Sequence, residues 1–473
     1  MPLNNTLEVI SKDQFDKIHN ASLKILKETG IKFHCPEALE MFKKNGAKVD
    51  GETVFITEKM VTDALATCPS TFEWTARNPK HSVTVGEGFL VQPNVGPVFI
   101  QDMENGRRKA TLEDYANVIK ICQAGKYVHL NGTIPVDPSD VDSEAKHLHM
   151  MYEILKNTDK PIIGFCFEGD KVRQNFDMIN LAFGGADFLE DHHCLGVLVN
   201  PLTPLGFASE TVETIMAYAK RNQVTLLAPC IMAGISGPIS LLGTAVLQNT
   251  ELLAGIVLTQ MTRPGAPIVY ATASTTGHMQ TGAFAAGTPE AMLINTPNIQ
   301  MGNEYYNLPT RTMCGITHSK ELDCQAGYET MMSLLMGVLS GANIGVQCLG
   351  TLDALMTLSY EKMIIDQEII SRCLRIKQGI NTTDEDLAVK AIQEIGHGGT
   401  YLMHPSTFKE CRNMWSPDIS DWNAHDAWEA AGKEDLVTRA NKTFKEVLAK
   451  APETLLDPDV DTALKDYINK VGL

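Results

Sequence analysis

Short apolar runs alternate with amphipathic stretches of helical period over most of this chain. One run lies within residues 89–101, and seven more cover residues 128–133, 161–167, 194–199, 225–229, 267–273, 310–316 and 344–349. Helices are predicted between and after these runs, over residues 142–157, 170–182, 209–221, 241–262, 288–298, 322–339 and 359–376. Alternating strands and helices indicate a parallel sheet, and eight strands favour an α/β fold closed into a (β/α)8 TIM barrel over an open doubly wound sheet.

Mostly helical segments precede and follow this barrel pattern. Residues 1–82 are predicted to form a mostly helical N-terminal extension, with helices over residues 11–29, 36–44 and 57–66. Residues 83–380 form the barrel, which begins with a hairpin that turns at Glu104-Asn105-Gly106. Residues 381–473 are predicted to be C-terminal helical additions, with a glycine-rich loop at residues 395–402 that packs on the barrel.

The predicted carboxyl ends of the eight strands carry almost no acids or bases. They read Gln92-Pro-Asn94, Gly132-Thr133, Phe165-Cys166-Phe167, Asn200-Pro201, Pro229-Cys230, Ala273-Ser274, Cys314-Gly315 and Gln347-Cys348. The active site of such a barrel lies at these ends. We therefore expect neither ordinary hydrolysis nor aldol chemistry, and expect the reactive group to come from another molecule.

The bulk composition excludes several classes of partner. The chain has 473 residues, of which 40 are basic and 57 acidic, for a net charge of −17. Nucleic acids and anionic membranes both require a basic surface, so we expect neither as a partner. No signal peptide is visible, the longest apolar stretches, such as residues 252–258, are too short to span a bilayer, and the eleven cysteines include no CxxC pair. These features predict a cytoplasmic, reduced protein.

Two histidine patterns invite a metal-binding interpretation that their context disfavours. Residues 191–196 read Asp-His-His-Cys-Leu-Gly and fit the DxHxxG pattern by which cobalamin-binding domains supply a histidine to cobalt. In those domains the motif follows a strand and leads into a helix, whereas here it follows a helical segment and leads into a strand. His147 and His149 lie in a predicted helix, where residues two apart face different sides, and we interpret that helix as a surface helix.

Four cysteines and the glycine-rich loop each allow two interpretations. Cys166, Cys230, Cys314 and Cys348 fall at or near strand ends, where they could bind zinc or fill the barrel as small apolar residues. We favour filling, and predict no metal site. Residues 396–399 could cradle a phosphate through backbone amides, but they lack the lysine of a P-loop. A loop that closes over the barrel mouth is the favoured interpretation.

Aromatic side chains and one polar cluster stand where a ligand could bind. The aromatic candidates are Phe165, Phe167, Tyr305, Tyr306 and Tyr401. Aromatic faces attract quaternary ammonium groups, although alternation along strands would place half of these rings in the core. The segment after the seventh strand adds His318, which could orient a ligand, and Asp323 and Gln325, which could contact it. For Asp323, capping of the following helix is the default.

Three parts of the sequence carry a resemblance to a known family: residues 312–329, Gly398-Gly399-Thr400-Tyr401-Leu402, and the pair His404 and Arg412. The chain resembles the trimethylamine methyltransferase superfamily over nearly its whole length. The resemblance implies a (β/α)8 barrel and transfer of a methyl group from a methylamine to the cob(I)alamin of a separate, small corrinoid protein. The archaeal trimethylamine branch carries pyrrolysine at about residues 314–319, where this chain has only ordinary residues. The chain is thus similar to the non-pyrrolysine branch, whose substrates are quaternary amines such as glycine betaine, proline betaine, carnitine and γ-butyrobetaine.

The resemblance implies a site that positions its substrate and supplies no reagent of its own. A quaternary amine leaves as a neutral tertiary amine, so no general acid is needed, and cob(I)alamin is the nucleophile. Positioning supplies the rest of the catalysis. The candidate residues are His318 and Gln347 as catalytic, and Phe165, Phe167, Asn94, Tyr305, Tyr401 and Arg412 as substrate-binding. We further expect no tightly bound cofactor, no metal and a homo-oligomer.

Two other functions stay open at this point. A TIM-barrel lyase or aldolase would carry a lysine or metal-binding carboxylates at its strand ends, where only Glu168 and Asp353 lie. A non-catalytic betaine-binding protein would bind its ligand tightly and transfer no methyl group to a corrinoid partner. Among the betaines, glycine betaine is the first expectation because it is the commonest, and proline betaine is the next.

Overall fold

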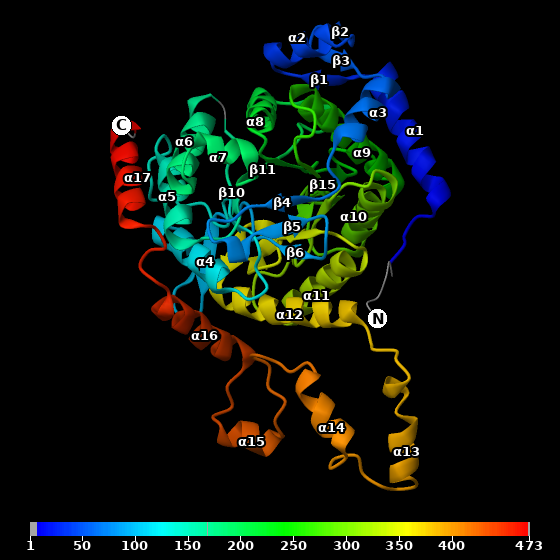
Figure 1. Ribbon diagram of the computed structural model, residues 1–473, viewed down its shortest axis with the longest axis vertical. Coiled ribbons are helices and arrows are strands. Elements are labelled where there is room, and N and C mark those ends of the chain that lie inside the picture. The colour runs from blue at the N-terminus through cyan, green and yellow to red at the C-terminus, as the bar shows by residue number, and fades with distance from the viewer. Residues whose placement is uncertain (1–6, 168, 472–473) are drawn as a thin grey trace.

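Eight parallel strands form the centre of the structure, a computed structural model that describes residues 7–167 and 169–471 (Figure 1). They pair in the order β6-β19-β18-β15-β13-β11-β10-β9. Their bounds are β6 (Leu90–Val91), β9 (Asn131–Gly132), β10 (Ile162–Ile163), β11 (Leu195–Val199), β13 (Val224–Leu227), β15 (Ile268–Thr272), β18 (Thr310–Met313) and β19 (Ile344–Val346). The amides of His129 and Leu130, just before β9, donate to the carbonyl of Val91 at 2.9 and 3.1 Å, which closes the sheet into a barrel. The predicted (β/α)8 fold is confirmed.

A ring of helices surrounds the strands. These are α4 (Leu112–Ala124), α5 (Lys146–Asn157), α6 (Asp170–Phe183), α7 (Ala186–Asp191), α8 (Ser209–Lys220), α9 (Leu241–Thr262), α10 (Pro289–Gln300), α11 (Cys324–Leu339) and α12 (Tyr360–Gln378). Thr111 and Asp114 form a capping box at α4, while Ser240 and Asp323 each accept a hydrogen bond from an amide of the first turn of α9 and α11. Such caps satisfy amides that lack a partner within the helix, so these residues define where the helices begin.

Helix α9 is long and apolar enough to cross a membrane by length and composition. However, 78% of its apolar window is buried, and it packs against α1 (Lys12–Glu28), α3 (Glu58–Thr67), α8 and α10. The expectation that every apolar stretch is too short to span a bilayer is therefore wrong for α9. Its apolar character is explained by its place in the core.

The N-terminal extension closes the amino-terminal end of the barrel. Strands β4 (Phe72–Trp74) and β5 (Val83–Val85) pair there, and the indole of Trp74 lies so close to Gly196 of β11 that a side chain at residue 196 would overlap it. Trp74 packs in one apolar cluster with inward-facing side chains of the barrel, among them Leu130, Ile163 and Val269. The rest of the extension comprises α1, α2 (Pro36–Lys44), α3 and the strands β1 (Ile31–Phe33), β2 (Lys48–Asp50) and β3 (Thr53–Phe55). These strands form a sheet in which β1 pairs with β12 (Gly206–Phe207), a strand of the barrel segment between β11 and α8.

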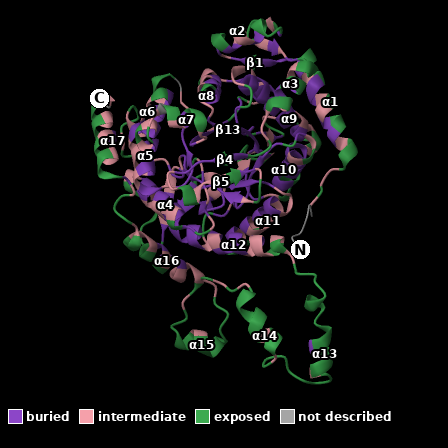
Figure 2. Ribbon diagram, in the orientation of Figure 1, coloured by how far each residue is buried: buried purple, intermediate pink, exposed green. Residues whose placement is uncertain are grey.

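The C-terminal segment divides into a part that packs on the barrel and a part that projects from it (Figure 1). Helix α16 (Leu436–Lys450) lies against α4 and α12, and α17 (Pro458–Val471) lies against α5 and α6. Residues 380–433, called the arm below, contain α13 (Val389–Ile395), α14 (Pro405–Glu410) and α15 (His425–Ala430) and extend away from the barrel. Figure 2 shows the arm mostly exposed. The glycine-rich loop therefore lies on the arm, not over the mouth of its own barrel.

Candidate active site at the barrel mouth

Side-chain amides tie the carboxyl ends of the first and last barrel strands together. Gln347 follows β19 with a φ of +65°, and its Nε2 donates to the Val95 carbonyl at 2.9 Å while its Oε1 accepts from the Val95 amide at 3.3 Å. Asn94 Oδ1 accepts from the Leu349 amide at 3.3 Å. The buried Nδ2 of Asn94 has no partner among the described residues. Gln347 thus holds the frame of the mouth, while Asn94 keeps a free donor in it.

Inside the barrel, Arg311 of β18 is a buried charge without a carboxylate partner among the described residues. The hydroxyl of the preceding Thr310 donates to Asn303 outside the barrel at 3.1 Å, so strand alternation turns Arg311 inward. The Arg311 side chain is 2% exposed, and its Nε donates to Gln92 Oε1 at 2.9 Å. Its Nη1 and the Nε2 of Gln92 are buried and unpaired within the described residues. Burial lowers the pKa of Arg311 to about 10, so the group stays charged at neutral pH and can bind an anion.

Three rings lie together at the end of β10. The ring centroids of Phe165 and Phe167 are 5.7 Å apart, and the imidazole of His147 meets Phe167 edge to face at 5.6 Å. His147 Nε2 lies 2.5 Å from Gln174 Oε1, and its buried Nδ1 has no partner in the described part of the chain. Burial lowers the pKa of His147, which favours the neutral ring. The interpretation of α5 as a surface helix is wrong at this residue, because His147 is buried against a candidate ligand-binding ring.

Glu329 of α11 holds the loop that carries His318. Its Oε2 accepts from the Thr317 hydroxyl at 2.6 Å and from the His318 amide at 2.8 Å, and its Oε1 accepts from Gln325 Nε2 at 3.0 Å. Burial lowers the pKa of His318, and the charge of Lys320 lowers it further. This loop therefore presents a neutral imidazole after β18, and Gln325 supports the loop through Glu329.

A small sheet and an apolar cluster cover part of the mouth. Strands β14 (Met232–Ala233), β16 (Thr275–Gly277) and β17 (Phe284–Ala285) come from the loops after β13 and β15. Met313, Val346 and Phe284 belong to one apolar cluster at the ends of β15, β18 and β19. A second sheet joins β20 (Thr351–Leu352) and β21 (Thr357–Ser359) to the hairpin of β7 (Phe99–Asp102) and β8 (Gly106–Lys109), the hairpin that the sequence predicts. The mouth is therefore more sheltered from water than bare strand ends would be.

Three exposed apolar side chains stand on the small sheet, and we call them the rim. Ile239 and Met279 both lie over Gly234, and Ile235 and Met279 lie over Gly277, so the three are neighbours. All three are exposed. The rim borders the mouth, because its loops leave the carboxyl ends of β13 and β15.

Asp353 and the four cysteines near the strand ends do not gather around one point. Asp353 lies 3.3 Å from Arg107 and 3.9 Å from Lys320, and Glu168 lies outside the described residues. The thiols of Cys314 and Cys348 are buried 3.4 Å apart. Cys166 contacts Thr214 and Cys230 is exposed, so the four cysteines do not converge. Within residues 7–167 and 169–471, no group of three His, Cys, Asp or Glu side chains is placed to hold a metal ion.

The histidines of the DxHxxG-like segment have structural contacts. His192 stacks on Phe188 with ring centroids 4.0 Å apart, and the Nδ1 of His193 lies 2.7 Å from the Asn222 carbonyl. The segment runs from α7 into β11, which is the context that the sequence predicts. Both imidazoles are therefore held by contacts within the chain.

Three predicted site residues lie away from the mouth of their own chain. Tyr305 precedes β18, so it lies at the opposite end of that strand, where its hydroxyl donates to Asp16 at 2.8 Å and its ring packs on Phe15 of α1. Tyr401 and Arg412 are on the arm, and both are exposed. Within one chain the structure brings none of these three to Phe165 and Phe167.

The comparison with known proteins places this chain in a family. A family model described as trimethylamine methyltransferase (MTTB) matches residues 2–471. The chain belongs to the trimethylamine methyltransferase family. It is 36% identical to the glycine betaine methyltransferase of Desulfitobacterium hafniense (strain Y51) over 98% of this chain and 97% of that protein. It is 31% identical to the proline betaine:corrinoid methyltransferase of Eubacterium limosum, over 98% of this chain and 96% of that protein.

The solved structures that resemble this chain bear out its fold. The monomethylamine methyltransferase MtmB of Methanosarcina barkeri aligns with a TM-score of 0.53 at 12% identity, over 100% of this chain and 90% of that one. The resemblance of the sequence to the trimethylamine methyltransferase family is confirmed, and the protein is a methyltransferase. Sequence reasoning gave no site role to Arg311, Gln92, His147 or Glu329, although Gln92 belongs to one of the predicted strand ends. A charged residue inside the apolar run 310–316 was the one available signal for Arg311.

Proposed function

We propose that this methyltransferase transfers a methyl group from a betaine, a quaternary amine that carries a carboxylate, to the cob(I)alamin of a separate corrinoid protein. The names of two relatives support this proposal, one a glycine betaine methyltransferase and the other a proline betaine:corrinoid methyltransferase. The observation that carries it is the buried Nη1 of Arg311 inside the barrel, which has no hydrogen-bond partner among the described residues.

A carboxylate would satisfy the groups that the barrel leaves unpaired. Burying a charge without a partner is costly, and a carboxylate on a guanidinium forms strong charge-assisted hydrogen bonds. Arg311 Nη1, Gln92 Nε2 and Asn94 Nδ2 are buried donors in need of an acceptor. Trimethylamine has no carboxylate and would leave the Nη1 of Arg311 without an acceptor. A betaine is therefore favoured over trimethylamine as the substrate.

Aromatic faces would hold the other end of the betaine. Phe165 and Phe167 offer π faces to a quaternary ammonium, which cannot accept or donate a hydrogen bond. Burial lowers the pKa of both His147 and His318 and so favours their neutral forms, which do not repel the cation. The apolar cluster with Met313 and Val346 limits the access of water.

No acid or base of this chain takes part in the bond changes. The C–N bond breaks with its electron pair on nitrogen, so the product is a neutral tertiary amine that needs no proton to leave. The corrinoid of the partner supplies the nucleophile. The role of the barrel is to orient one methyl group outward and to exclude water, which is catalysis by positioning. We place the protein in the cytoplasm, because cob(I)alamin needs a reducing compartment.

The test is a methyl-transfer assay with a substrate panel. The purified protein is mixed with reduced corrinoid protein and with glycine betaine, proline betaine, carnitine, γ-butyrobetaine or trimethylamine, and the cob(I)alamin absorption is followed. We expect at least one betaine, glycine betaine first, to consume cob(I)alamin while trimethylamine does not. Tight betaine binding without any consumption would instead support a non-catalytic binding protein. Turnover of trimethylamine alone would contradict the proposed role of Arg311.

A further inference from the structure

Helix α12 carries an ion pair that lies entirely inside the protein. The Nζ of Lys362 lies 2.7 and 2.8 Å from the two carboxylate oxygens of Asp366, one helical turn later. The two side chains are 2% and 0% exposed, and among residues 7–167 and 169–471 this is the one ion pair with both partners buried. Burial raises the pKa of Asp366 even though the charge of Lys362 opposes this rise. The pair is therefore kept at a cost in desolvation.

This pair is joined to the ends of two neighbouring barrel strands. Asp366 Oδ2 accepts from the amide of Gly350, in the loop after β19, at 2.7 Å. Lys362 Nζ donates to the hydroxyl of Thr330 on α11 at 2.9 Å. That hydroxyl donates to the carbonyl of Gly315, just after β18, at 3.4 Å. One buried pair thus holds backbone groups that follow both strands.

The backbone at these two glycines is closely surrounded. Gly315 and Gly350 both have a φ of +78°, a conformation that residues with a side chain rarely adopt. A Cβ on Gly315 would lie 2.7 Å from the Cα of Cys348, and one on Gly350 would lie 2.7 Å from the carbonyl oxygen of Ser359. The Ser359 amide also donates to the Gly350 carbonyl at 2.8 Å. The start of α12 therefore binds Gly350 through both its amide and its carbonyl.

The two anchored segments carry candidate site residues. Gly350 lies three residues after Gln347, and Gly315 lies three residues before His318. The hydroxyl of Thr351, next to Gly350, donates to the Gln347 carbonyl at 3.0 Å. A displacement of either glycine would therefore be passed on to a residue of the mouth.

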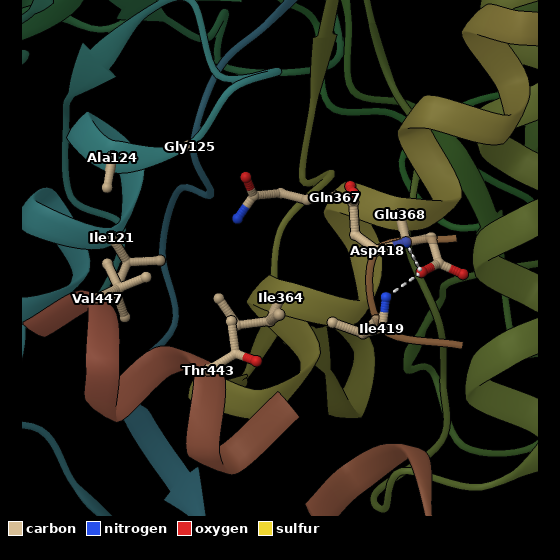
Figure 3. Close-up of a pocket in the computed structure, with 10 residues that line it drawn as sticks. All are labelled: Ile121, Ala124, Gly125, Ile364, Gln367, Glu368, Asp418, Ile419, Thr443 and Val447. Atoms are coloured by element: carbon tan, nitrogen blue, oxygen red, sulfur yellow. Dashed lines mark hydrogen bonds between the residues drawn. The ribbon is translucent and has the colours of Figure 1, made fainter. Parts of the chain in front are cut away.

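Glu368, a second buried carboxylate on α12, acts on a different part of the chain. Its Oε2 accepts from the amides of Asp418, Ile419 and Ser420 at 3.0, 2.7 and 3.1 Å. Its Oε1 pairs with Arg372 at 2.9 Å. Figure 3 shows this carboxylate turned toward Asp418 and Ile419, beside a cavity of about 150 Å³ between α4, α12 and α16. This carboxylate therefore holds the root of the arm, not a loop of the mouth.

We propose that Lys362 and Asp366 are positioning residues of the methyl transfer, which hold the segments after β18 and β19 where the reaction needs them. Well-packed apolar residues often stabilise a fold at least as well as a buried ion pair does, so stability does not explain this pair. What the pair adds is direction, because its ammonium and its carboxylate each reach one strand end.

The effect on turnover rests on the proposed function, in which the barrel catalyses by positioning. A displacement of about 1 Å in such a site can cost roughly 100-fold in rate. Arg311, which would bind the substrate carboxylate, has no hydrogen bond to the pair among the described residues. Loss of the pair should therefore slow the transfer more than it weakens binding of the betaine.

The test compares two double variants of the full-length protein that differ in one side chain. K362M/D366L removes both charges and every hydrogen bond of the pair. K362M/D366N also removes both charges but offers the Gly350 amide an oxygen in place of the carboxylate. Glu368→Gln is the matched control, because it weakens a buried carboxylate of the same helix that holds the arm.

Two measurements separate positioning from a purely structural role. In single-turnover methyl transfer to the reduced corrinoid protein, K362M/D366L should be roughly 30-fold slower at saturating betaine, with the half-saturating betaine concentration changed by less than about threefold. K362M/D366N should recover most of the rate. Hydrogen exchange in residues 347–354 should be roughly tenfold faster in K362M/D366L, and close to that of the wild type in K362M/D366N and in Glu368→Gln.

Thermal melting completes the test, and K362M/D366L should melt at or above the temperature of the wild type. Failure of this variant to fold would show that the pair holds the fold as a whole and would overturn the proposal. So would a wild-type rate or wild-type exchange in K362M/D366L, equal rates in the two double variants, or faster exchange of residues 347–354 in Glu368→Gln. A wild type that transfers no methyl group from any betaine would instead refute the proposed function, and hydrogen exchange alone would then decide whether the pair holds the two segments.

Discussion

The barrel and the arm differ in which side chains they bury and which they expose to water. In the barrel, Trp74 is fully buried in an apolar cluster, yet the guanidinium of Arg311 also lies inside, and its Nη1 has no partner in the described part of the chain. In the arm, Leu402 and Met403 stand in water, while the carboxylate at its root, Glu368, is saturated with donors. The barrel therefore holds a buried polar group without a full set of partners, whereas the arm exposes apolar side chains to water.

This difference indicates two kinds of missing molecule. A buried charge without a partner and a large exposed apolar surface are both unfavourable, and proteins keep them where a ligand or another protein supplies the partner. A small anion would supply the partner that the buried guanidinium in the barrel lacks. A protein surface would cover the exposed apolar side chains of the arm. The following changes test whether the two regions really obey these opposite requirements.

The largest difference should come from two tryptophans. Trp74→Ala leaves a cavity in the barrel and should lower the free energy of unfolding by about 3–5 kcal/mol. Trp422→Ala removes an exposed side chain of the arm and should change it by less than about 0.5 kcal/mol. Urea unfolding measures both. Equal losses would show that the arm is as well packed as the barrel.

Arg311→Met should separate activity from stability. Loss of the charge that would pair with a substrate carboxylate should reduce kcat/KM for a betaine roughly 30-fold or more, since breaking a buried charge pair costs about 2–5 kcal/mol. The ligand-free protein should be unchanged or more stable, because an unpaired buried charge has been removed.

The paired variant Arg311→Lys keeps the positive charge but loses the planar guanidinium with its several donors. Its activity should therefore fall between that of the wild type and that of Arg311→Met. Methyl transfer and thermal melting are the measurements. Full activity of Arg311→Met would remove this residue from the site.

Glu368→Gln should loosen the root of the arm. The neutral amide keeps the shape but loses the charge that receives three amides and Arg372, at a cost of about 2–4 kcal/mol. Hydrogen exchange at residues 415–422 should accelerate, while exchange in the barrel strands stays slow. Glu385→Gln on the arm is the matched control, because its pair with Lys409 is exposed to water and should contribute far less to stability.

The pH dependence of stability should have opposite signs for two buried glutamates. Burial alone would raise the pKa of Glu368, but hydrogen bonds from Ser420 and the Ile419 amide outweigh it and lower the pKa to about 2. The contribution of Glu368 to the free energy of unfolding is therefore present above the usual pKa of 4.5 and is lost as pH falls toward 2. Burial raises the pKa of Glu251 on α9 to about 7. Its contribution is full below 4.5 and is lost as pH rises through 7.

Glu251→Gln should therefore flatten the stability profile between pH 4.5 and 7, by about 1–3 kcal/mol, and leave the profile below pH 4 unchanged. Denaturant unfolding at stepped pH values gives the profile. A variant whose profile differs from the wild type only below pH 4 would contradict the assignment.

Most of the barrel was predictable because its elements carry periodic signals. Helix α9 has the predicted bounds, and all eight strands lie within the predicted runs except β13, which begins one residue earlier. The position of the arm was not predictable, since the helical pattern of residues 389–395 reads the same whether its apolar side chains meet the barrel or water. Exposure depends on tertiary packing, which local pattern does not contain.

The positions of the candidate site residues were predictable only where those residues followed a strand end. Phe165, Phe167, Asn94 and Gln347 lie there, because the carboxyl ends of parallel strands converge. Tyr305 precedes its strand and so lies at the other end of the barrel. The position of Arg311 was not predictable, because the sequence of an apolar run does not show whether a charged side chain within it points toward the helices or toward the barrel interior.

The bond between Gln347 and Val95 also determines when the mouth can form. These residues are 252 positions apart, and β6 is paired with β19, so the frame of the mouth unites an early and a late part of the chain. Contacts of such long range form slowly. During synthesis the chain must expose the unpaired edges of β6 and β18 until β19 has been made, and such edges favour aggregation. Competence for catalysis is thus acquired in a late step of folding.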